Sequence, residues 1–286
     1  MNHPIDVSTR RSGASVPTFE DRSGRPVALR VFGAESARIT VLALHSIGLN
    51  GRSFRPLAQA LAEQADVRVF ALDLRGHGKR ADLGEFDFDD YVDDAVRAIA
   101  CIGSPVIHVM GHSLGGAIAA SAAARLAPDA GCTVGSLSLL ASPAQGGDVF
   151  RERAADCLSK GMEVMREATL LRWFGGVQQD VQDHQFAARS LAEMRVEHFA
   201  GAWAALAQFE GYADLVGRLP RTLAIAGEED LSTPPAVMAR IGTAFEQAGR
   251  APLFTQVDLP QSGHMYPLAA TPALVESLLE HWLKNA

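Results

Sequence analysis

A serine flanked by two glycines, in the order Gly111, Ser113 and Gly115, is the strongest chemical signal in this sequence. The mostly apolar run 106–110 before it is typical of a β-strand, and the alanine-rich run 117–124 after it is typical of a helix. A serine hydroxyl is a poor nucleophile, so an enzyme that uses one must hold it beside a base and aim backbone donors at the oxyanion that forms. A sharp strand-to-helix turn meets these needs, because glycines on either side of the serine remove Cβ atoms that would clash. The pattern therefore predicts a nucleophile elbow.

The same pattern also has a purely structural interpretation, in which Ser113 only caps a tight turn between a strand and a helix. The rest of the chain favours catalysis, because four other loops with reactive or constrained residues follow predicted strands. These loops are residues 45–48 (His-Ser-Ile-Gly), 73–78 (Asp-Leu-Arg-Gly-His-Gly), 227–230 (Gly-Glu-Glu-Asp) and 262–267 (Ser-Gly-His-Met-Tyr-Pro). Ligands of open α/β sheets bind at the carboxyl ends of the strands, so we expect these loops to converge on Ser113.

Strands and helices alternate along the chain, which predicts a doubly wound, mostly parallel sheet flanked by helices. Continuous apolar runs predict strands covered on both faces, and apolar residues spaced by three and four predict helices. Besides the elbow strand and its helix, the expected strands are 26–33, 39–44, 67–72, 133–140, 222–226 and 253–259, and the expected helices are 53–63, 87–102, 235–247 and 272–283.

Between residues 148 and 212 the strand signals stop, so this segment is predicted to be a helical cap inserted into an α/β core of residues 25–147 and 213–286. Residues 1–24 have no apolar region of the signal-peptide type and are expected to form a loose leader. The cap contains six arginines but ten acidic residues, so its mean field is not expected to attract anions. One inward-facing arginine could still bind a carboxylate, and the sequence does not identify which.

The functional motifs occur in a fixed order: the His45 loop, the Arg-Gly-His-Gly turn at 75–78, Ser113, Asp230 and His264. This order resembles the α/β-hydrolase superfamily over roughly residues 25–284. Within the superfamily, the loop 227–235 is similar to the acid loop of the 3-oxoadipate enol-lactone hydrolases, and the chain looks most like capped bacterial hydrolases of that type. It resembles the carbon–carbon bond hydrolases of aromatic breakdown less closely. The resemblance implies an α/β-hydrolase fold, a mostly parallel sheet flanked by helices, with an inserted helical cap.

The expected catalytic residues are Ser113, Asp230 and His264. His264 would take the proton of Ser113 as general base and return it to the leaving group, because imidazole changes its charge near neutral pH. Asp230 would fix the tautomer of His264 and stabilise its cation. Glu228 and Glu229 are alternatives for the acid, since Asp230 could instead cap the helix that follows.

The backbone N–H groups of Leu114 and Ile47 are expected to form the oxyanion hole. Leu114 directly follows the nucleophile, and Ile47 lies in the loop after an earlier strand. This loop departs from the common His-Gly form, because Ser46 follows His45, and the serine side chain could narrow the hole or hydrogen-bond the substrate. The expected substrate-binding residues are His45, Ser46, Trp173 and Trp203.

Composition limits the other classes of function. The chain has 286 residues, 48% of them hydrophobic, which is enough for one large core. A net charge of −7 and a pI near 5.7 argue against a nucleic-acid partner, and no segment is apolar for long enough to cross a bilayer. The three cysteines form no C-x-x-C pair and are expected to be buried free thiols in a reducing cytoplasm. No metal-ligand spacing, P-loop or dinucleotide motif is present, so neither metal nor cofactor is expected.

These observations predict a serine hydrolase that cleaves a small ester or lactone through an acyl-enzyme intermediate. Two alternatives remain open. One is a carbon–carbon bond hydrolase that uses the same three residues, and the other is a non-catalytic ligand receptor built on the same fold.

Overall fold

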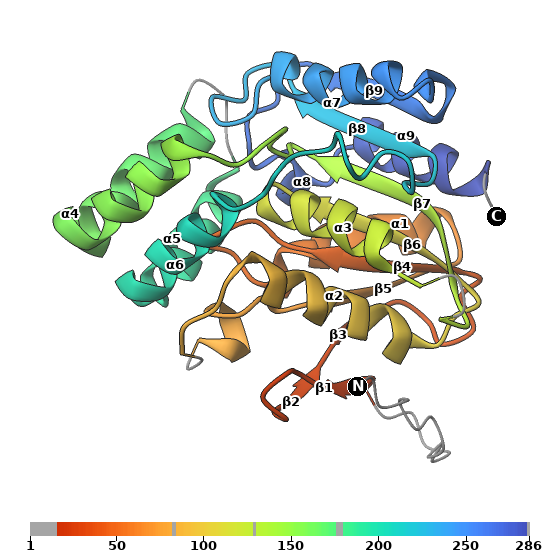
Figure 1. Cartoon of the computed structure of the whole chain (residues 1–286), viewed down its shortest axis with the longest axis horizontal. Helices are drawn as coiled ribbons and strands as arrows, with labels where there is room; N and C mark the ends of the chain where they lie inside the picture. Colours follow the sequence, from red (N-terminus) through yellow and green to blue (C-terminus); the bar gives the residue numbers. More distant parts are fainter. Residues whose placement is uncertain (1–15, 82–83, 128–129, 176–179, 285–286) are drawn as a thin grey trace.

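The computed structural model describes residues 16–81, 84–127, 130–175 and 180–284. Within these residues the main sheet has seven strands (Figure 1), in the spatial order β3 (Arg30–Phe32), β5 (Val67–Leu72), β4 (Ile39–Leu44), β6 (Val106–His112), β7 (Thr133–Leu140), β8 (Thr222–Gly227) and β9 (Phe254–Leu259). The strand β3 is antiparallel to β5, and the other neighbouring strands are parallel. The predicted mostly parallel sheet of an α/β fold is therefore confirmed.

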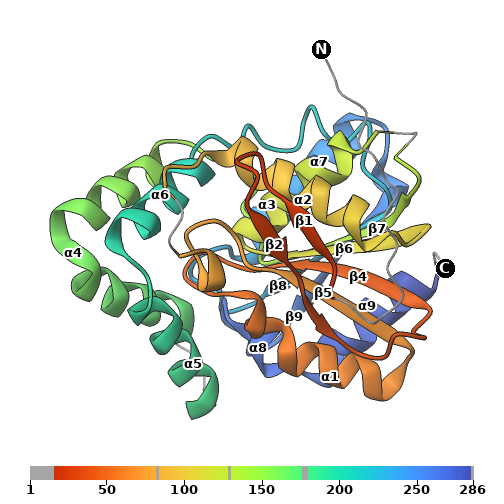
Figure 2. The same ribbon diagram turned by 90° about the horizontal axis from the view of Figure 1, so that it is seen from below.

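Helices cover both faces of the sheet (Figures 1 and 2). One face carries α2 (Phe88–Ile102), α3 (Leu114–Arg125) and α7 (Pro235–Gln247), and the other carries α1 (Arg55–Gln64), α8 (Tyr266–Ala269) and α9 (Pro272–Leu283). Short 3₁₀ turns occur at η1 (Gly51–Phe54), η2 (Gly78–Arg80) and η3 (Ala251–Leu253). Successive side chains of a strand point to opposite faces. On β4, Leu42 and Leu44 join one core cluster and Val41 and Ala43 join the other, which explains why this strand is apolar throughout.

Three helices form what we call the α4–α6 segment: α4 (Asp148–Phe174), α5 (Val181–Ala192) and α6 (Val196–Leu206). Figure 1 shows this segment at the left of the α/β core. The helix α4 is interrupted at Gly161, which has φ 77° and ψ 164°, so α4 consists of two helical halves. The predicted cap reached residue 212, whereas residues 207–212 are turns and irregular chain.

The N-terminal region differs from the prediction. The strand β1 (Thr18–Glu20) pairs antiparallel with β2 (Pro26–Ala28), so the loose leader predicted for residues 1–24 is wrong from residue 18 onward. Residues 1–15 lie outside the described residues. The single strand predicted for 26–33 is divided between β2 and β3, because the chain leaves the two-stranded sheet at the buried Leu29 and then joins the main sheet.

The three cysteines are free. Only Cys157 is buried, whereas Cys101 and Cys132 are half-buried, so the prediction of three buried thiols is correct for Cys157 alone. In the described parts of the chain, no helix combines the length and the apolar character that crossing a membrane requires.

Candidate active site

Ser113 lies in a strained turn between β6 and α3. Its backbone has φ 55° and ψ −118°, a conformation that residues with a Cβ rarely adopt. A Cβ on Gly111 would lie 2.1 Å from the carbonyl oxygen of Gly115, and a Cβ on Gly115 would lie 2.0 Å from that of Leu44. Both positions therefore require glycine. The strand, the tight turn and the helix follow one another as the sequence motif predicted.

The strand order places Ser113 at a topological switch point. From β4 the chain continues to β5 on one side, and it then crosses to β6 on the other side of β4. The loops that leave β4 and β6 diverge there and create a crevice at the carboxyl ends of the strands. Ser46 and Ile47, which follow β4, consequently line one cavity together with Ser113 and His264.

His264 and Asp230 form a buried pair, with 2% of each residue exposed. The distance from His264 Nδ1 to Asp230 Oδ2 is 2.7 Å. Because a carboxylate only accepts, Nδ1 carries the proton, and Nε2 remains the nitrogen that can exchange a proton with a substrate or nucleophile. Within the described chain, His264 and the Ser113 hydroxyl share the cavity but are not joined by a hydrogen bond. In the absence of substrate, the distance between a catalytic base and its nucleophile is often too long for a hydrogen bond, and it shortens when substrate binds.

The environment of Asp230 keeps its carboxylate ionised. Oδ1 accepts hydrogen bonds from the backbone N–H groups of Ser232 (2.6 Å) and Thr233 (2.9 Å), and Oδ2 accepts one from the Thr233 hydroxyl (2.7 Å). Burial raises the pKa of Asp230, but the charge of His264 and the hydrogen bonds from His264 and Thr233 lower it more, so the pKa lies below its usual range. Glu228 and Glu229 are exposed, as expected for residues that leave the strand earlier.

His112 holds the loop that carries His264. Its Nε2–H donates to the backbone carbonyl of His264 at 2.9 Å. Burial, followed by the charge of His264, lowers the pKa of His112 to about 3, so this ring is neutral. Trp173 also stacks on the His264 ring, with 6.4 Å between the ring centroids. His112 therefore holds the backbone of His264, and Trp173 packs on its side chain.

The peptide between Ser46 and Ile47 is held by two hydrogen bonds to its carbonyl group. The carbonyl oxygen of Ser46 accepts hydrogen bonds from His45 Nδ1 (2.8 Å) and from the backbone N–H of Leu49 (3.2 Å). In a trans peptide the C=O and N–H groups point in opposite directions. The N–H of Ile47 therefore points away from these two donors, and Ile47 lines the cavity.

His45 does not occupy the position that the sequence predicted. It was expected to contact the substrate, but its ring is fully buried and does not line the cavity with Ser113. Its Nε2 accepts from the backbone N–H of Leu74 at 3.0 Å, and its Nδ1–H donates to Ser46. Burial lowers the pKa of His45 to about 4, so the ring stays neutral and serves as a bridge between two loops.

His77 bridges the same two loops beside His45, with 5.1 Å between the ring centroids. Its Nε2 accepts from the backbone N–H of Gly48 (3.0 Å), and its Nδ1–H donates to the carbonyl of Arg75 (2.8 Å). Burial lowers the pKa of His77 to about 3. Two neutral histidines therefore fix the loop that contains Ile47.

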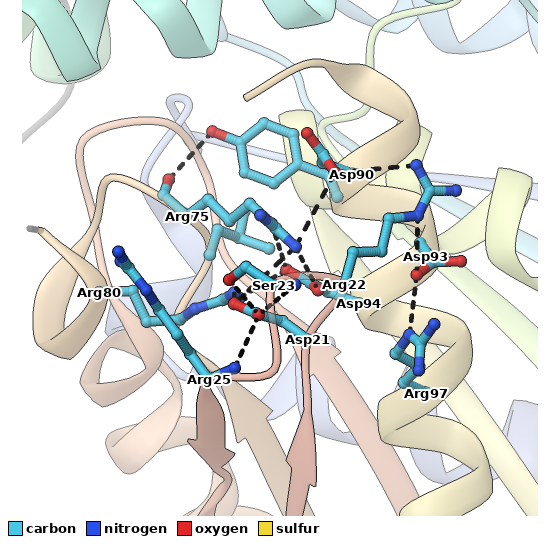
Figure 3. Close-up of polar contacts among 12 residues, drawn as sticks. Asp21, Arg22, Ser23, Arg25, Arg75, Arg80, Asp90, Asp93, Asp94 and Arg97 are labelled. Atoms are coloured by element: carbon cyan, nitrogen blue, oxygen red, sulfur yellow. Dashed lines mark hydrogen bonds and ion pairs between the residues drawn. The ribbon is translucent and has the colours of Figure 1, made fainter. Parts of the chain in front are cut away.

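A network of ion pairs holds the turn that carries His77 (Figure 3). Arg75 binds Asp94 with two hydrogen bonds of 2.8 and 3.0 Å, and Arg80 links Asp94 (2.6 Å) to Asp21 (3.0 Å). Asp21 belongs to the segment that was expected to be loose, yet only 3% of it is exposed. It is held there by Arg80 and by three donors from its own turn, which is the physical reason for the correction.

Asp73 fixes the start of the same turn. It accepts two hydrogen bonds from Arg30 (3.0 and 2.7 Å) and one each from the backbone N–H groups of Gly51 (2.8 Å) and Lys79 (3.0 Å). Burial raises the pKa of Asp73, but the bonds from Arg30 and Lys79 outweigh this effect and hold it at about 2.

The cavity at Ser113 is small, about 20 Å³, which is room for roughly one water molecule. The residues that line it are Ser46, Ile47, Ser113, Pro143, Phe150, Arg153, Trp173, Trp203, Leu206, Ser232, Thr233 and His264. Trp173, Trp203 and Ser46, which were expected to bind substrate, line the cavity with Ser113. Sequence reasoning missed Phe150 and Thr233, and it did not single out Arg153. The described residues contain no group of three His, Cys, Asp or Glu side chains that could hold a metal ion.

Comparison with known proteins identifies the family. The family model described as "Alpha/beta hydrolase family" matches residues 41–278. The chain therefore belongs to the α/β hydrolase family.

Solved structures agree over almost the whole chain. A hydrolase from Pseudomonas aeruginosa PA01 has a TM-score of 0.78 and 22% identity, and the match covers 95% of this chain and 99% of that one. The enol-lactonase from Burkholderia xenovorans LB400 has a TM-score of 0.77 and 21% identity, with coverage of 93% and 100%. At such identities the likeness establishes the fold alone, and at that level the predicted resemblance to enol-lactone hydrolases is confirmed.

Among curated proteins, an (E)-2-((N-methylformamido)methylene)succinate hydrolase from Acinetobacter baylyi is 22% identical over 276 residues, which are 93% of each chain. Protein phosphatase methylesterase 1 from Mus musculus is 34% identical over 115 residues, which are 38% of this chain. This second match spans 30% of the length of the mouse protein.

Proposed function

We propose that this protein is a serine hydrolase that cleaves a small ester or lactone through an acyl-enzyme intermediate. One observation carries the proposal. Ser113, in a strained elbow, shares a cavity with His264, whose Nδ1 is held at 2.7 Å by a buried carboxylate. Nucleophile, base and orienting acid lie on three different loops, and this convergence supports catalysis more than a capped turn.

In the first half of the proposed reaction, Ser113 Oγ attacks the carbonyl carbon of the substrate, and its proton passes to His264 Nε2. Asp230 stabilises the imidazolium that forms. The oxyanion of the tetrahedral intermediate accepts hydrogen bonds from the backbone N–H groups of Leu114 and Ile47. When the intermediate collapses, the C–O bond of the leaving group breaks, and His264 gives the proton to the departing alkoxide.

In the second half, a water molecule attacks the acyl-Ser113 carbonyl while His264 takes its proton. Collapse of this second intermediate regenerates the Ser113 hydroxyl and releases the carboxylic acid. In a lactone the leaving hydroxyl stays attached to the acyl chain, so a single hydroxy acid leaves in this step. The same residues, with water as the second nucleophile, suffice for an ester and for a lactone.

We further propose that the α4–α6 segment acts as a cap. Trp173 and Trp203 come from this segment and line the cavity with Ser113, so the segment separates the reacting atoms from bulk water. A cavity of about 20 Å³ cannot hold an ester, so a substrate must enter by displacing side chains or moving the cap. The likeness to an enol-lactonase and the partial match to a methylesterase support ester or lactone chemistry.

Labelling with a fluorophosphonate tests the nucleophile. Intact-mass measurement should show one adduct on the wild-type protein and none on Ser113→Ala. An adduct that persists in the variant would place the nucleophile elsewhere. Hydrolysis of 4-nitrophenyl acetate should occur with the wild type and be lost in Ser113→Ala, whereas a ligand receptor would hydrolyse neither this ester nor a lactone. Faster cleavage of a ring-fission diketone than of any ester would instead favour the carbon–carbon hydrolase.

A further inference from the structure

The hydroxyl of Ser232 is a buried polar group beside the nucleophile, and the proposed reaction does not yet use it. Ser232 lines the cavity of about 20 Å³ together with Ser113 and His264. Its Oγ is buried and has no hydrogen-bond partner among the residues that the structure describes. A buried hydroxyl without a partner destabilises the folded protein, so one that is retained beside a reactive serine calls for a functional explanation.

The neighbouring hydroxyl of the same loop is already paired. The Thr233 hydroxyl lies 2.7 Å from Asp230 Oδ2 and 2.9 Å from the backbone carbonyl oxygen of Ala141. It therefore has two acceptors for its single proton. Of the two hydroxyl groups in this loop, that of Ser232 is the one left available to a bound molecule within the described part of the chain.

One carboxylate fixes the position of Ser232 relative to His264. Asp230 accepts from the backbone N–H of Ser232 at 2.6 Å through Oδ1 and from His264 Nδ1 at 2.7 Å through Oδ2. Ser232 and His264 belong to the loops after β8 and β9, which are parts of the α/β core, whereas Trp173 and Trp203 reach the cavity from the α4–α6 segment. A substrate that displaces this segment therefore leaves the arrangement of Ser232 and His264 intact.

The size and the lining of the cavity suit one water molecule. A bound water needs about 10–15 Å³ of such volume and two to four polar partners, and the cavity offers about 20 Å³. Because Nδ1 of His264 carries the proton, Nε2 can accept one proton of a water, and Ser232 Oγ can accept the other. A lone pair of the water then stays available to attack a carbonyl carbon attached to Ser113.

We propose that Ser232 Oγ binds the water molecule that hydrolyses the acyl-enzyme. The inference rests on the acyl-enzyme function proposed above and adds a residue to its second half. The water oxygen bonds to the acyl carbon, one of its protons passes to His264 Nε2, and the other stays on the oxygen, hydrogen-bonded to Ser232. When the intermediate collapses, the bond from the acyl carbon to Ser113 Oγ breaks, Oγ takes the proton from His264, and the carboxylic acid is released.

Competition between water and methanol tests this role. Methanol has a single O–H, which it must give to His264, so it gains nothing from an acceptor at Ser232. Ser232→Ala should therefore slow hydrolysis of the acyl-enzyme more than its methanolysis. With 4-nitrophenyl acetate in dilute methanol, the ratio of methyl acetate to acetate should rise by about 3- to 10-fold, the equivalent of one neutral hydrogen bond.

Two serine variants serve as comparisons. Ser262→Ala is the matched control, because Ser262 lies in the loop of His264, its hydroxyl donates to the carbonyl of Pro260 at 3.0 Å, and it lies outside the described lining of the cavity. The product ratio should stay at the wild-type value in this variant. Ser46 does line the cavity, so a ratio that rises in Ser46→Ala and not in Ser232→Ala would show that the proposal names the wrong serine.

Two further measurements separate this role from the hydrolase function. Ser232→Ala should react with a fluorophosphonate as fast as the wild type, because formation of that adduct needs no water. A crystal structure of the wild type should show an ordered water within hydrogen-bond distance of Ser232 Oγ and His264 Nε2, and this water should be lost in Ser232→Ala.

An unchanged product ratio, labelling that slows as much as hydrolysis does, or a wild-type crystal structure without this water would overturn the role of Ser232. Each of these results would leave the nucleophile assignment intact as long as Ser113 is labelled. A wild type that is not labelled at Ser113 would instead refute the acyl-enzyme, and the role of Ser232 would fall with it.

Discussion

Replacement of Asp230 by asparagine tests how the carboxylate directs His264, because the structure determines which way the new amide must face. Oδ1 accepts from two backbone N–H groups, those of Ser232 and Thr233, and these donors cannot be reversed. The asparagine oxygen must therefore occupy the Oδ1 position. Its NH₂ group then takes the Oδ2 position, which lies 2.7 Å from His264 Nδ1.

The consequence is a change of tautomer. An amide NH₂ donates to Nδ1, so the imidazole proton moves to Nε2, and Nε2 can no longer accept the proton of Ser113. A serine hydrolase whose histidine is held in the wrong tautomer loses about 10³- to 10⁴-fold in kcat. The fold should be retained, because the amide oxygen still accepts both backbone hydrogen bonds. The effect should therefore appear in kcat and not in the circular dichroism spectrum.

The measurement is the steady-state hydrolysis of 4-nitrophenyl acetate at neutral pH, with the spectrum as a check of folding. Glu229→Gln is the matched control, because it makes the same chemical change one residue earlier at an exposed position. It should alter kcat by only a few-fold, and Glu228→Gln should behave in the same way. If Asp230→Asn keeps kcat within about tenfold of the wild type, or if a glutamine variant loses as much, the assignment of the acid is wrong.

Three further outcomes concern the scaffold of the site. Because the pKa of Asp73 is about 2 instead of 3.8, its ionised form stabilises the fold by about 2 kcal/mol at neutral pH. This contribution is lost as the pH falls from about 4 to 2. Denaturant titrations should therefore show that the difference in unfolding free energy between the wild type and Asp73→Asn shrinks over that pH range. Asp94→Ala leaves two buried arginines without their shared partner, so its unfolding free energy should fall by about 3–5 kcal/mol. Gly115→Ala should yield no folded protein by circular dichroism, since its Cβ would meet the Leu44 carbonyl at 2.0 Å, whereas Gly217→Ala, with nothing within 4 Å, should fold normally.

The sequence was sufficient to predict the sheet and the convergence of Ser113, Asp230 and His264, because both depend on local patterns. A strand that is apolar throughout, such as β4, is predicted to be buried on both faces. The turn at Ser113 was predicted from the glycines that it requires. The proximity of Asp230 and His264 was predicted because each follows a strand end, and the carboxyl ends of parallel strands meet at one edge of the sheet.

The sequence was not sufficient where a residue depends on partners far along the chain. A histidine in a polar loop after a strand looks like a residue that contacts substrate, and only the fold shows that both ring nitrogens of His45 are used by backbone groups. Asp21 likewise looks like part of a loose terminus, and its burial depends on Arg80, which is 59 positions away. Neither the contacts of His45 nor the pairing of Asp21 with Arg80 produces a recognisable pattern in the neighbouring sequence.

The charge of the α4–α6 segment shows the same limit for electrostatics. Counting charges predicts a field that does not attract anions, because acidic residues outnumber the arginines. The count treats all positions as equivalent, yet solvent screens exposed charges more strongly than partly buried ones. The interruption at Gly161 brings two arginines to Trp203, while acidic residues such as Asp148 and Asp156 pair with neighbouring cations at the surface. The net charge of the segment therefore does not describe the cavity of Ser113, which Arg153 lines.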